Sequence, residues 1–195
     1  MNLPNKLTVL RMILVPFFVF FMLAGFIPHN YIIAMAIFGI ASYTDHLDGK
    51  IARRDNLITN FGKLMDPLAD KVMVLSSLIC FVALGHTSPW FVILILFREL
   101  AVDGLRLVAS AEGKVIAANK WGKAKTVTQI VAILVVLGLQ YILQLGGTGL
   151  FTVSTTLSTA FHWIGEVFMA VATVMALISG VIYFRDNWDA VKDMK

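Results

Sequence analysis

Cysteine and charged residues are both scarce in this sequence. The single cysteine, Cys80, excludes a disulfide within the chain, and its apolar neighbours predict a buried core residue. Charged residues make up 14% of the 195 residues, whereas hydrophobic residues make up 58%. A soluble globular domain has about a quarter of its residues charged, so this composition excludes that class. It predicts an integral membrane protein.

The sequence also lacks a signal-peptide cleavage pattern, an internal repeat and a boundary between two domains. A lysine precedes the first apolar run, but no A-x-A-like pattern of small residues ends that run. We therefore expect a retained first helix and a single membrane domain over residues 1–195. The net charge of +4 does not indicate a nucleic-acid partner, because no soluble domain remains to bind one. Anionic lipid or a phosphorylated substrate is the better match.

Six apolar stretches are each long enough to cross a bilayer as a helix, which takes roughly 20 residues. They cover residues 8–26, 31–51, 64–84, 90–109, 124–145 and 161–184. Proline and glycine residues mark several of the breaks between them. The predicted fold class is therefore all-α: a polytopic membrane protein with six transmembrane helices and a short amphipathic, interfacial segment at the N-terminus.

Basic residues are absent from three of the five loops that join these stretches. All sixteen Lys and Arg residues lie near the N-terminus, in the second and fourth loops with the adjoining helix ends, within the fourth stretch, or at the C-terminus. By the positive-inside rule, both termini and the even-numbered loops face the cytoplasm. We therefore predict a protein of the cytoplasmic membrane whose second loop, with any active site beside it, lies on the cytoplasmic side.

Four aspartates form two pairs at helical spacing around the second loop: Asp45 with Asp48, and Asp66 with Asp70. Residues three or four apart share one face of a helix, so each pair points the same way. Ionisable groups within a membrane-spanning helix cost on the order of 3 kcal/mol each to insert, and they normally line a polar cavity. An all-carboxylate set suits hard cations, Mg²⁺ first and Mn²⁺ or Ca²⁺ next. Two divalent ions would balance the negative charge of four carboxylates, and a two-metal site favours the transfer of a phosphoryl group.

The aspartates could also serve a purpose that involves no bound metal. A buried ion-pair network with Arg53, Arg54 and Lys71 would balance their charge without one. A cation or proton transporter would likewise place aspartates within membrane helices. The acids cluster toward one membrane face, however, and the sequence shows no broken helices or inverted halves, which counts against a transporter.

The segment from Asp45 to Asp70 resembles the signature of the CDP-alcohol phosphotransferase family, D-x2-D-G-x2-A-R-x8-G-x3-D-x3-D. The matching residues are Asp45, Asp48, Gly49, Ala52, Arg53, Gly62, Asp66 and Asp70. The resemblance implies a six-helix membrane enzyme, usually a homodimer, that transfers a substituted phosphate from a CDP-linked donor to an alcohol and releases CMP. It also implies that the four aspartates ligate two divalent cations and that Asp70 is the base that deprotonates the alcohol.

Donor-binding residues follow from the same resemblance, which places Gly49, Ala52, Arg53 and Thr59 beside the nucleotide diphosphate. The missing Cβ of Gly49 permits close approach of a phosphate. Arg53 offers a planar fork that suits phosphate oxygens. Without a ligand, helix packing would account for Gly49 and a cytoplasmic flanking charge would account for Arg53.

The N-terminal segment offers a further donor contact. Asn5 and Thr8 lie one helical turn apart, with Arg11 another turn on, and could form a polar stripe that faces the nucleotide. Capping by Asn2 or Asn5, with Pro4 in the first turn, accounts for the same pattern without a ligand. Both interpretations are open.

A second basic group marks the predicted acceptor site. It consists of Arg98, Arg106, Lys123 and Lys125. Arg98 lies about 12 Å into the fourth stretch, too deep for an ordinary flanking charge. It needs a partner, for which Glu99 and Asp103 are the nearest acids in sequence. So many cations indicate a phosphorylated acceptor.

Three further blocks resemble the bacterial phosphatidylglycerophosphate synthase branch of that family: FRELAVDGLR, GKVIAANKWGKAKTVTQ and the opening N-x-P-N-x-L-T-x-x-R. This resemblance implies CDP-diacylglycerol as the donor and sn-glycerol 3-phosphate as the acceptor. Asp103 departs from the branch, which usually carries a small or hydroxyl residue there. The extra acid could weaken an anionic acceptor site, or it could pair with Arg98 or Arg106. Serine, inositol phosphate and phosphatidylglycerol are the alternative acceptors.

Overall fold

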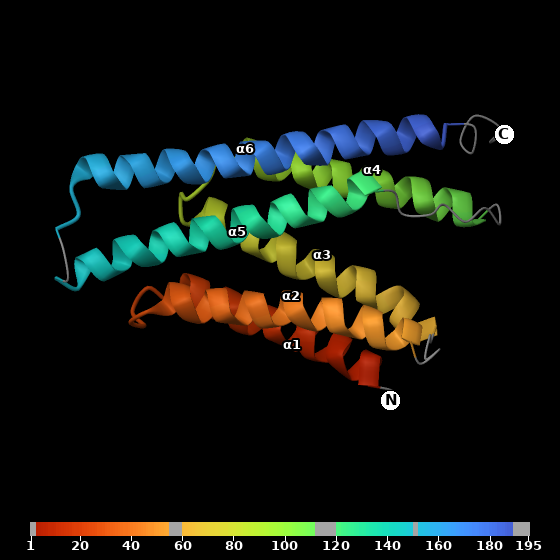
Figure 1. Ribbon diagram of the computed structural model, residues 1–195, viewed down its shortest axis with the longest axis horizontal. Coiled ribbons are helices and arrows are strands. Elements are labelled where there is room, and N and C mark those ends of the chain that lie inside the picture. The colour runs from red at the N-terminus through yellow and green to blue at the C-terminus, as the bar shows by residue number, and fades with distance from the viewer. Residues whose placement is uncertain (1–2, 55–59, 112–119, 150–151, 189–195) are drawn as a thin grey trace.

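The computed structural model describes residues 3–54, 60–111, 120–149 and 152–188, and within these ranges every regular element is helical. The six helices follow one another along the chain (Figure 1). They are α1 Leu3–Leu23, α2 Asn30–Arg54, α3 Asn60–Ala83, α4 Pro89–Ala111, α5 Lys120–Gly147 and α6 Thr155–Asp186. The prediction of an all-α fold with one helix for each apolar stretch is confirmed.

All six helices begin earlier than the sequence predicted, and the difference is largest for α1 and α6. α1 starts at Leu3, so the expected N-terminal interfacial segment continues into the first helix without a break. α6 starts at Thr155, where the Ser154 side chain caps it by accepting a hydrogen bond of 3.1 Å from the Leu157 backbone N–H. Polar residues that indicated a loop in the sequence therefore form a helix cap and a first turn.

Three helices of the described chain are long and apolar enough to cross a membrane: α1 over Asn5–Leu23, α5 and α6. α2 contributes a shorter apolar part, Asn30–Thr44. α3 and α4 carry charged residues that interrupt their apolar stretches. The chain is an integral membrane protein, while the number of six crossings stays a prediction.

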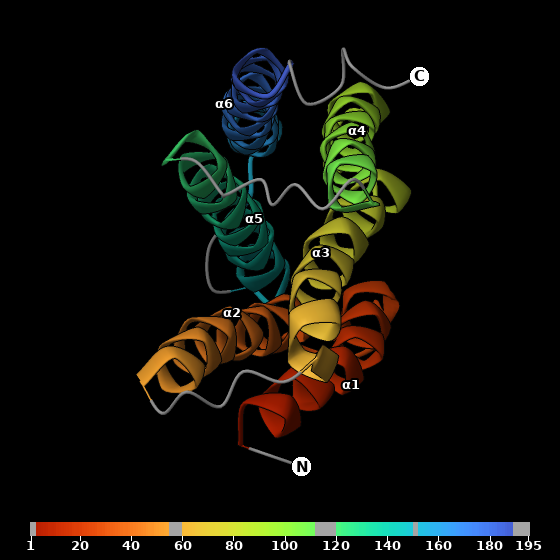
Figure 2. The same cartoon turned by 90° about the vertical axis from the view of Figure 1, so that its right-hand side faces the viewer.

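The helices form two groups that meet through α3 and α5. α1 packs against α2 and α3, whereas α6 packs against α4 and α5. Figure 2 looks onto one end of the bundle, where α3 and α5 face each other between the α1–α2 pair and the α4–α6 pair. α2 and α4 end, and α3 and α5 begin, at this same end (Figure 1). Charged residues from several helices are therefore brought to one end of the molecule.

Apolar side chains fill the middle of the bundle. Phe18 of α1 and Phe38 of α2 are fully buried, and their ring centroids are 6.1 Å apart. The same cluster includes Phe81 of α3, Leu137 of α5 and Met169 of α6. This shared core joins the two groups of helices and fixes how their charged ends approach one another.

At the opposite end, polar contacts fix the loop between α3 and α4. Tyr31 Oη and His86 Nε2 are 2.8 Å apart, and the Ser88 backbone N–H donates to Glu166 Oε1 at 2.8 Å. Burial, with a smaller effect from the nearby His162, lowers the pKa of His86 to about 4. The loop is therefore joined to α2 through a histidine that is neutral at pH 7, and to α6 through a carboxylate.

Candidate active site

A cavity of about 420 Å³ lies where α3, α4 and α5 approach one another at the charged end of the bundle. Its charged lining residues are Asp70, Lys71, Arg98, Glu99, Asp103, Arg106, Lys123 and Lys125. Five of these are basic and three are acidic, so the wall has an excess of positive charge. The volume falls within the usual range of small-molecule sites, roughly 300–1,000 Å³. A small anion is the ligand that such a wall favours.

The cavity brings together residues to which the sequence assigned two different roles. The four predicted acceptor residues, on α4 and α5, share it with Asp70 of α3, the predicted base. Asp70, Glu99 and Lys125 also line a second, smaller pocket. The predicted roles require Asp70 to lie beside the acceptor residues, but no local pattern in the sequence specifies that α3 packs beside α4 and α5. The juxtaposition is a finding of the structure, and the individual roles stay predictions.

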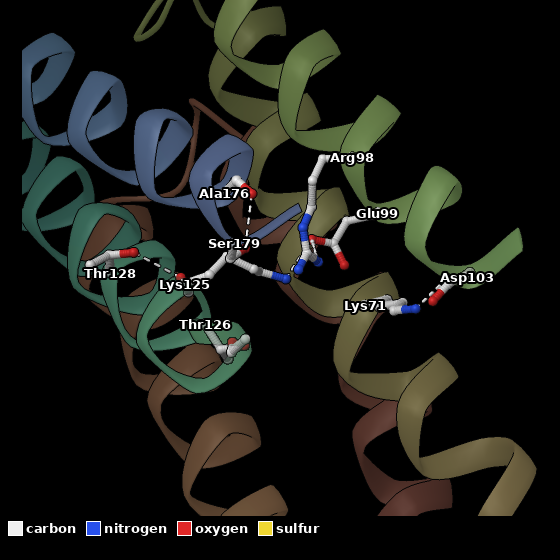
Figure 3. A network of polar contacts seen from close by, with 10 residues as sticks. Lys71, Arg98, Glu99, Asp103, Lys125, Thr126, Thr128, Ala176 and Ser179 are labelled. Carbon is white, nitrogen blue, oxygen red and sulfur yellow. Dashed lines mark hydrogen bonds and ion pairs between the residues drawn. The ribbon is translucent and has the colours of Figure 1, made fainter. Parts of the chain in front are cut away.

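Glu99 joins two of the basic residues from within the protein. It is 5% exposed, and its Oε1 accepts hydrogen bonds from Arg98 Nη1 at 3.2 Å and from Lys125 Nζ (Figure 3). Buried charges need partners of opposite sign, because the loss of hydration is costly. The expectation that Arg98 has an acidic neighbour as its partner is confirmed for Glu99. The three side chains together keep one net positive charge in the cavity wall.

Arg98 also lies against α6. A Cβ atom built on Gly180 would be 2.9 Å from Arg98 Cγ, closer than real Cβ contacts, so glycine leaves the space that this side chain occupies. Arg98 Nε is buried and has no hydrogen-bond partner within the described part of the chain. The guanidinium therefore retains hydrogen-bonding capacity that Glu99 does not use.

Asp103 of α4 pairs with Lys71 of α3. Lys71 Nζ donates to Asp103 Oδ2, and this ion pair joins the two helices at the cavity (Figure 3). The pairing of Asp103 with Arg98 or Arg106, one of the two alternatives that the sequence left open, is not found among the described side chains, because Asp103 bonds Lys71, Arg98 bonds Glu99 and Arg106 contacts α6. The Asp103 and Lys71 side chains are 40% and 26% exposed, so a ligand in the cavity can reach them.

Arg106 is held by an aromatic residue that the sequence did not indicate. Its Nε donates a hydrogen bond of 2.8 Å to Tyr183 Oη, and its guanidinium carbon lies 5.2 Å from the centre of the Tyr183 ring. Tyr183 is buried on α6. The two residues are 77 positions apart, and no spacing or motif in the sequence connects them.

The helix positions of the predicted metal ligands are confirmed, because α2 carries Asp45 and Asp48 while α3 carries Asp66 and Asp70. Asp70 is the one ligand of the four whose side chain is described, and no group of three or more potential metal ligands occurs among the described side chains. The other predicted residues of this segment lie outside the described side chains or outside the described chain. They are Asp45, Asp48, Gly49, Ala52, Arg53, Thr59 and Asp66.

The polar stripe near the N-terminus lies inside the protein. Asn5, Thr8 and Arg11 are all buried on α1. Asn5 is not the helix cap, because α1 already begins at Leu3. The stripe therefore faces the bundle interior, as the predicted donor contact requires, and its binding role stays a prediction.

Comparison with known proteins relates almost the whole chain to one family. The family model described as CDP-alcohol phosphatidyltransferase matches residues 1–178. The chain is 41% identical over 202 residues to the CDP-diacylglycerol--glycerol-3-phosphate 3-phosphatidyltransferase of Bacillus subtilis, a match that covers 98% of this chain and 97% of the relative. It is 40% identical over 184 residues to a probable phosphatidylglycerophosphate synthase of Mycobacterium tuberculosis, covering 93% and 79% of the two chains.

A third relative extends the match to another bacterial group. The chain is 32% identical over 200 residues to the CDP-diacylglycerol--glycerol-3-phosphate 3-phosphatidyltransferase of Pseudomonas fluorescens, covering 98% of this chain and 93% of the relative. The aspartate signature, the all-helical fold and the relatives agree with the family model. The chain belongs to the CDP-alcohol phosphatidyltransferase family.

Proposed function

We propose that this membrane enzyme transfers the phosphatidyl group of CDP-diacylglycerol to sn-glycerol 3-phosphate, forming phosphatidylglycerophosphate and CMP. The observation that carries the proposal is the cavity in which Asp70 lies with five basic residues. The names of the relatives in B. subtilis and P. fluorescens support this donor and this acceptor. A carboxylate for the hydroxyl end and cations for the phosphate end match the two functional groups of the acceptor.

The phosphate of the acceptor binds the basic wall of the cavity. Arg98 and Lys125 share the Glu99 carboxylate, and a phosphate dianion supplies further negative charge to these two cations. Arg106 and Lys123 line the same cavity and add to the attraction for a dianion. Serine and unphosphorylated inositol carry no dianionic group that could balance this wall.

The reaction needs a base beside the acceptor hydroxyl, and Asp70 takes that role. Its carboxylate removes the proton of the 1-hydroxyl while the oxygen attacks the phosphorus that carries diacylglycerol. The bond from this phosphorus to the oxygen of CMP breaks, and its electron pair leaves with CMP. Positioning dominates such a transfer, so the basic wall contributes by holding the phosphate at a fixed distance from Asp70.

The carboxylate donor set fits divalent cations. Carboxylate oxygens are the ligands that Mg²⁺ and Mn²⁺ prefer, and the negative charge of four carboxylates would balance the positive charge of two divalent ions. The ligands would be Asp45, Asp48, Asp66 and Asp70, from two helices whose ends lie at the same end of the bundle. When bound, the ions supply positive charge that neutralises the diphosphate of the donor.

The nucleotide of the donor binds residues of α1, of α2 and of the segment that follows α2. The proposed set is Asn5, Thr8, Gly49, Ala52, Arg53 and Thr59. The burial of Asn5 and Thr8 on α1 supports the inclusion of these two residues in the donor-binding set. The distribution of Lys and Arg supports a cytoplasmic location for the cavity and both termini. A homodimer is proposed by analogy with the family alone.

Release of CMP tests the function. Purified protein receives CDP-diacylglycerol, Mg²⁺ and one acceptor at a time: sn-glycerol 3-phosphate, serine, inositol phosphate or phosphatidylglycerol. CMP release with glycerol 3-phosphate above all others supports the proposal. Release with a different acceptor overturns the acceptor assignment. No release with any of them, together with cation or proton flux in liposomes, overturns the enzyme assignment and favours a transporter.

A further inference from the structure

The Lys71–Asp103 pair lines the cavity, but the function proposed above gives it no contact with the acceptor. An acid beside an anion site is unfavourable unless its charge is balanced, and Lys71 provides that balance. The ion pair uses Asp103 Oδ2. Asp103 Oδ1 forms no hydrogen bond or ion pair with any residue in the described part of the chain. The side chain of a residue that lines the cavity therefore has one carboxylate oxygen whose capacity to accept hydrogen bonds is unused.

The pair lines the same cavity as the residues at both ends of the proposed acceptor site. Lys71 directly follows Asp70 on α3, and both residues line the cavity. On α4, Asp103 lies about one turn after Glu99 and about one turn before Arg106, so it shares a helix face with residues of the basic wall. A ligand bound in this cavity therefore shares it with the Asp103 carboxylate as well as with Asp70 and the cations.

We propose that Asp103 selects acceptors that carry a second hydroxyl beside the reacting one. Its Oδ1 accepts a hydrogen bond from the 2-hydroxyl of a polyol phosphate, while Lys71 keeps the carboxylate from repelling the phosphate. This inference rests on the proposed function. A carboxylate suits the task because it only accepts hydrogen bonds, and because a bond from a neutral hydroxyl to a charged acceptor is stronger than one to a neutral acceptor.

The test compares two acceptors in the full-length protein. They are sn-glycerol 3-phosphate and 3-hydroxypropyl phosphate, which lacks only the 2-hydroxyl. The wild-type protein is expected to prefer glycerol 3-phosphate in kcat/KM by at least about tenfold, the range for a hydrogen bond to a charged group. A wild-type preference below about threefold overturns the inference whatever the variants do. Absence of CMP release with both acceptors overturns the proposed function instead.

Variants of Asp103 then identify the residue responsible. Asp103→Ala is expected to lower kcat/KM for glycerol 3-phosphate by about tenfold or more and to leave 3-hydroxypropyl phosphate nearly unchanged, so that the preference disappears. Asp103→Asn keeps a hydrogen-bonding group and is expected to retain part of the preference. Asp186→Ala removes an exposed acid of α6 and is the matched control, with the wild-type preference.

Two results would overturn the role of Asp103. In the first, Asp103→Ala lowers kcat/KM for both acceptors by the same factor, which is the result for a purely structural tie between α3 and α4. In the second, Lys71→Ala alone removes the preference while Asp103→Ala retains it, which would assign the selection to Lys71. Retained turnover of 3-hydroxypropyl phosphate shows that a variant is folded. If Asp103→Ala does not fold, a preference of the wild type that is reduced in Asp103→Asn, through a lower kcat/KM for glycerol 3-phosphate alone, supports the role, and equal losses on both acceptors in Asp103→Asn contradict it.

Discussion

Arg106 of α4 donates a hydrogen bond of 2.8 Å from Nε to Tyr183 Oη of α6, and its guanidinium carbon lies 5.2 Å from the centre of the same ring. One buried tyrosine thus positions a basic side chain of the proposed phosphate site in two ways. The cation–π contact keeps the guanidinium near the ring, and the hydrogen bond restricts its rotation. The remaining N–H groups of Arg106 are left for the acceptor.

Removing the tyrosine hydroxyl therefore tests the acceptor site without removing a charge. Tyr183→Phe is expected to raise KM for glycerol 3-phosphate roughly two- to tenfold, the usual range for one hydrogen bond, with little change in kcat or in KM for the donor. Steady-state kinetics of CMP release measure this. Tyr141→Phe, which removes an exposed hydroxyl at the opposite end of the bundle, is the control. An unchanged acceptor KM would place the phosphate away from Arg106.

Asp70 is expected to be the residue whose loss most reduces turnover. Asp70→Asn keeps the shape of the side chain but cannot take up a proton, so kcat should fall by about 10²–10⁴-fold, the usual contribution of a general base. CMP release in single-turnover experiments measures the loss, and thermal unfolding checks that the variant is folded. Asp186→Asn is the matched control. Near-normal turnover of Asp70→Asn would rule out the proposed base.

Glu99 is expected to stabilise the fold as well as the site. Its removal leaves Arg98 and Lys125 buried without their shared carboxylate, which for a buried pair costs about 3–5 kcal/mol. Glu99→Ala should therefore lower the free energy of unfolding strongly, as measured by denaturation in detergent. The control is Glu166→Gln, which keeps an acceptor for the Ser88 N–H and should have a small effect. Equal stability of the two variants would show that Arg98 and Lys125 do not depend on Glu99 as their partner.

The contact between Gly180 and Arg98 gives a prediction about a residue that touches no ligand. In Gly180→Ala the new methyl group lies 2.9 Å from Arg98 Cγ, near the root of the side chain, so Arg98 must move. KM for glycerol 3-phosphate is expected to rise several-fold, while KM for the donor stays close to the wild-type value. Gly138→Ala adds a methyl group with no atom within 4 Å and is the control. Identical kinetics for both variants would contradict the proposed role of Arg98.

His86 predicts how stability depends on pH. Its pKa is about 4 in the folded protein and near 6.5 when the chain is unfolded, because burial and the nearby His162 disfavour the charged ring. Between these values the unfolded chain binds more protons than the folded protein. The free energy of unfolding should therefore fall as pH decreases from about 6.5 to about 4, and this loss should stop below the folded pKa.

His86→Gln tests that dependence, since glutamine does not titrate and still offers a hydrogen bond to Tyr31. Melting temperatures in detergent are compared for the two proteins from about pH 7 to about pH 5. The melting temperature of the wild type minus that of the variant is expected to decrease as pH falls, because only the wild type loses the contribution of a neutral His86. A difference that stays constant would show that His86 does not titrate in the way its burial predicts.

Apolar stretch length and aspartate spacing were sufficient to predict the six helices and the placement of each aspartate pair on one helix. Depth counting also predicted that Arg98 has an acidic partner. The sequence did not predict which side chains from distant segments come into contact. Tyr183 with Arg106, Gly180 with Arg98, and Lys71 with Asp103 each join separate helices, and no local pattern specifies which side chains meet when helices pack. Helix starts were also missed, because polar residues can form caps and first turns as well as loops.

The ion pair between Lys71 and Asp103 has one more consequence. α3 carries Asp70, whereas α4 carries Arg98 and Arg106, so the packing of these two helices, of which the pair is one contact, sets how far the proton-accepting group lies from the phosphate-binding group. A fixed span admits alcohols with one particular number of atoms between hydroxyl and phosphate. Under the proposed function, the site therefore discriminates by acceptor length, and shorter or longer hydroxyalkyl phosphates would bind without reacting.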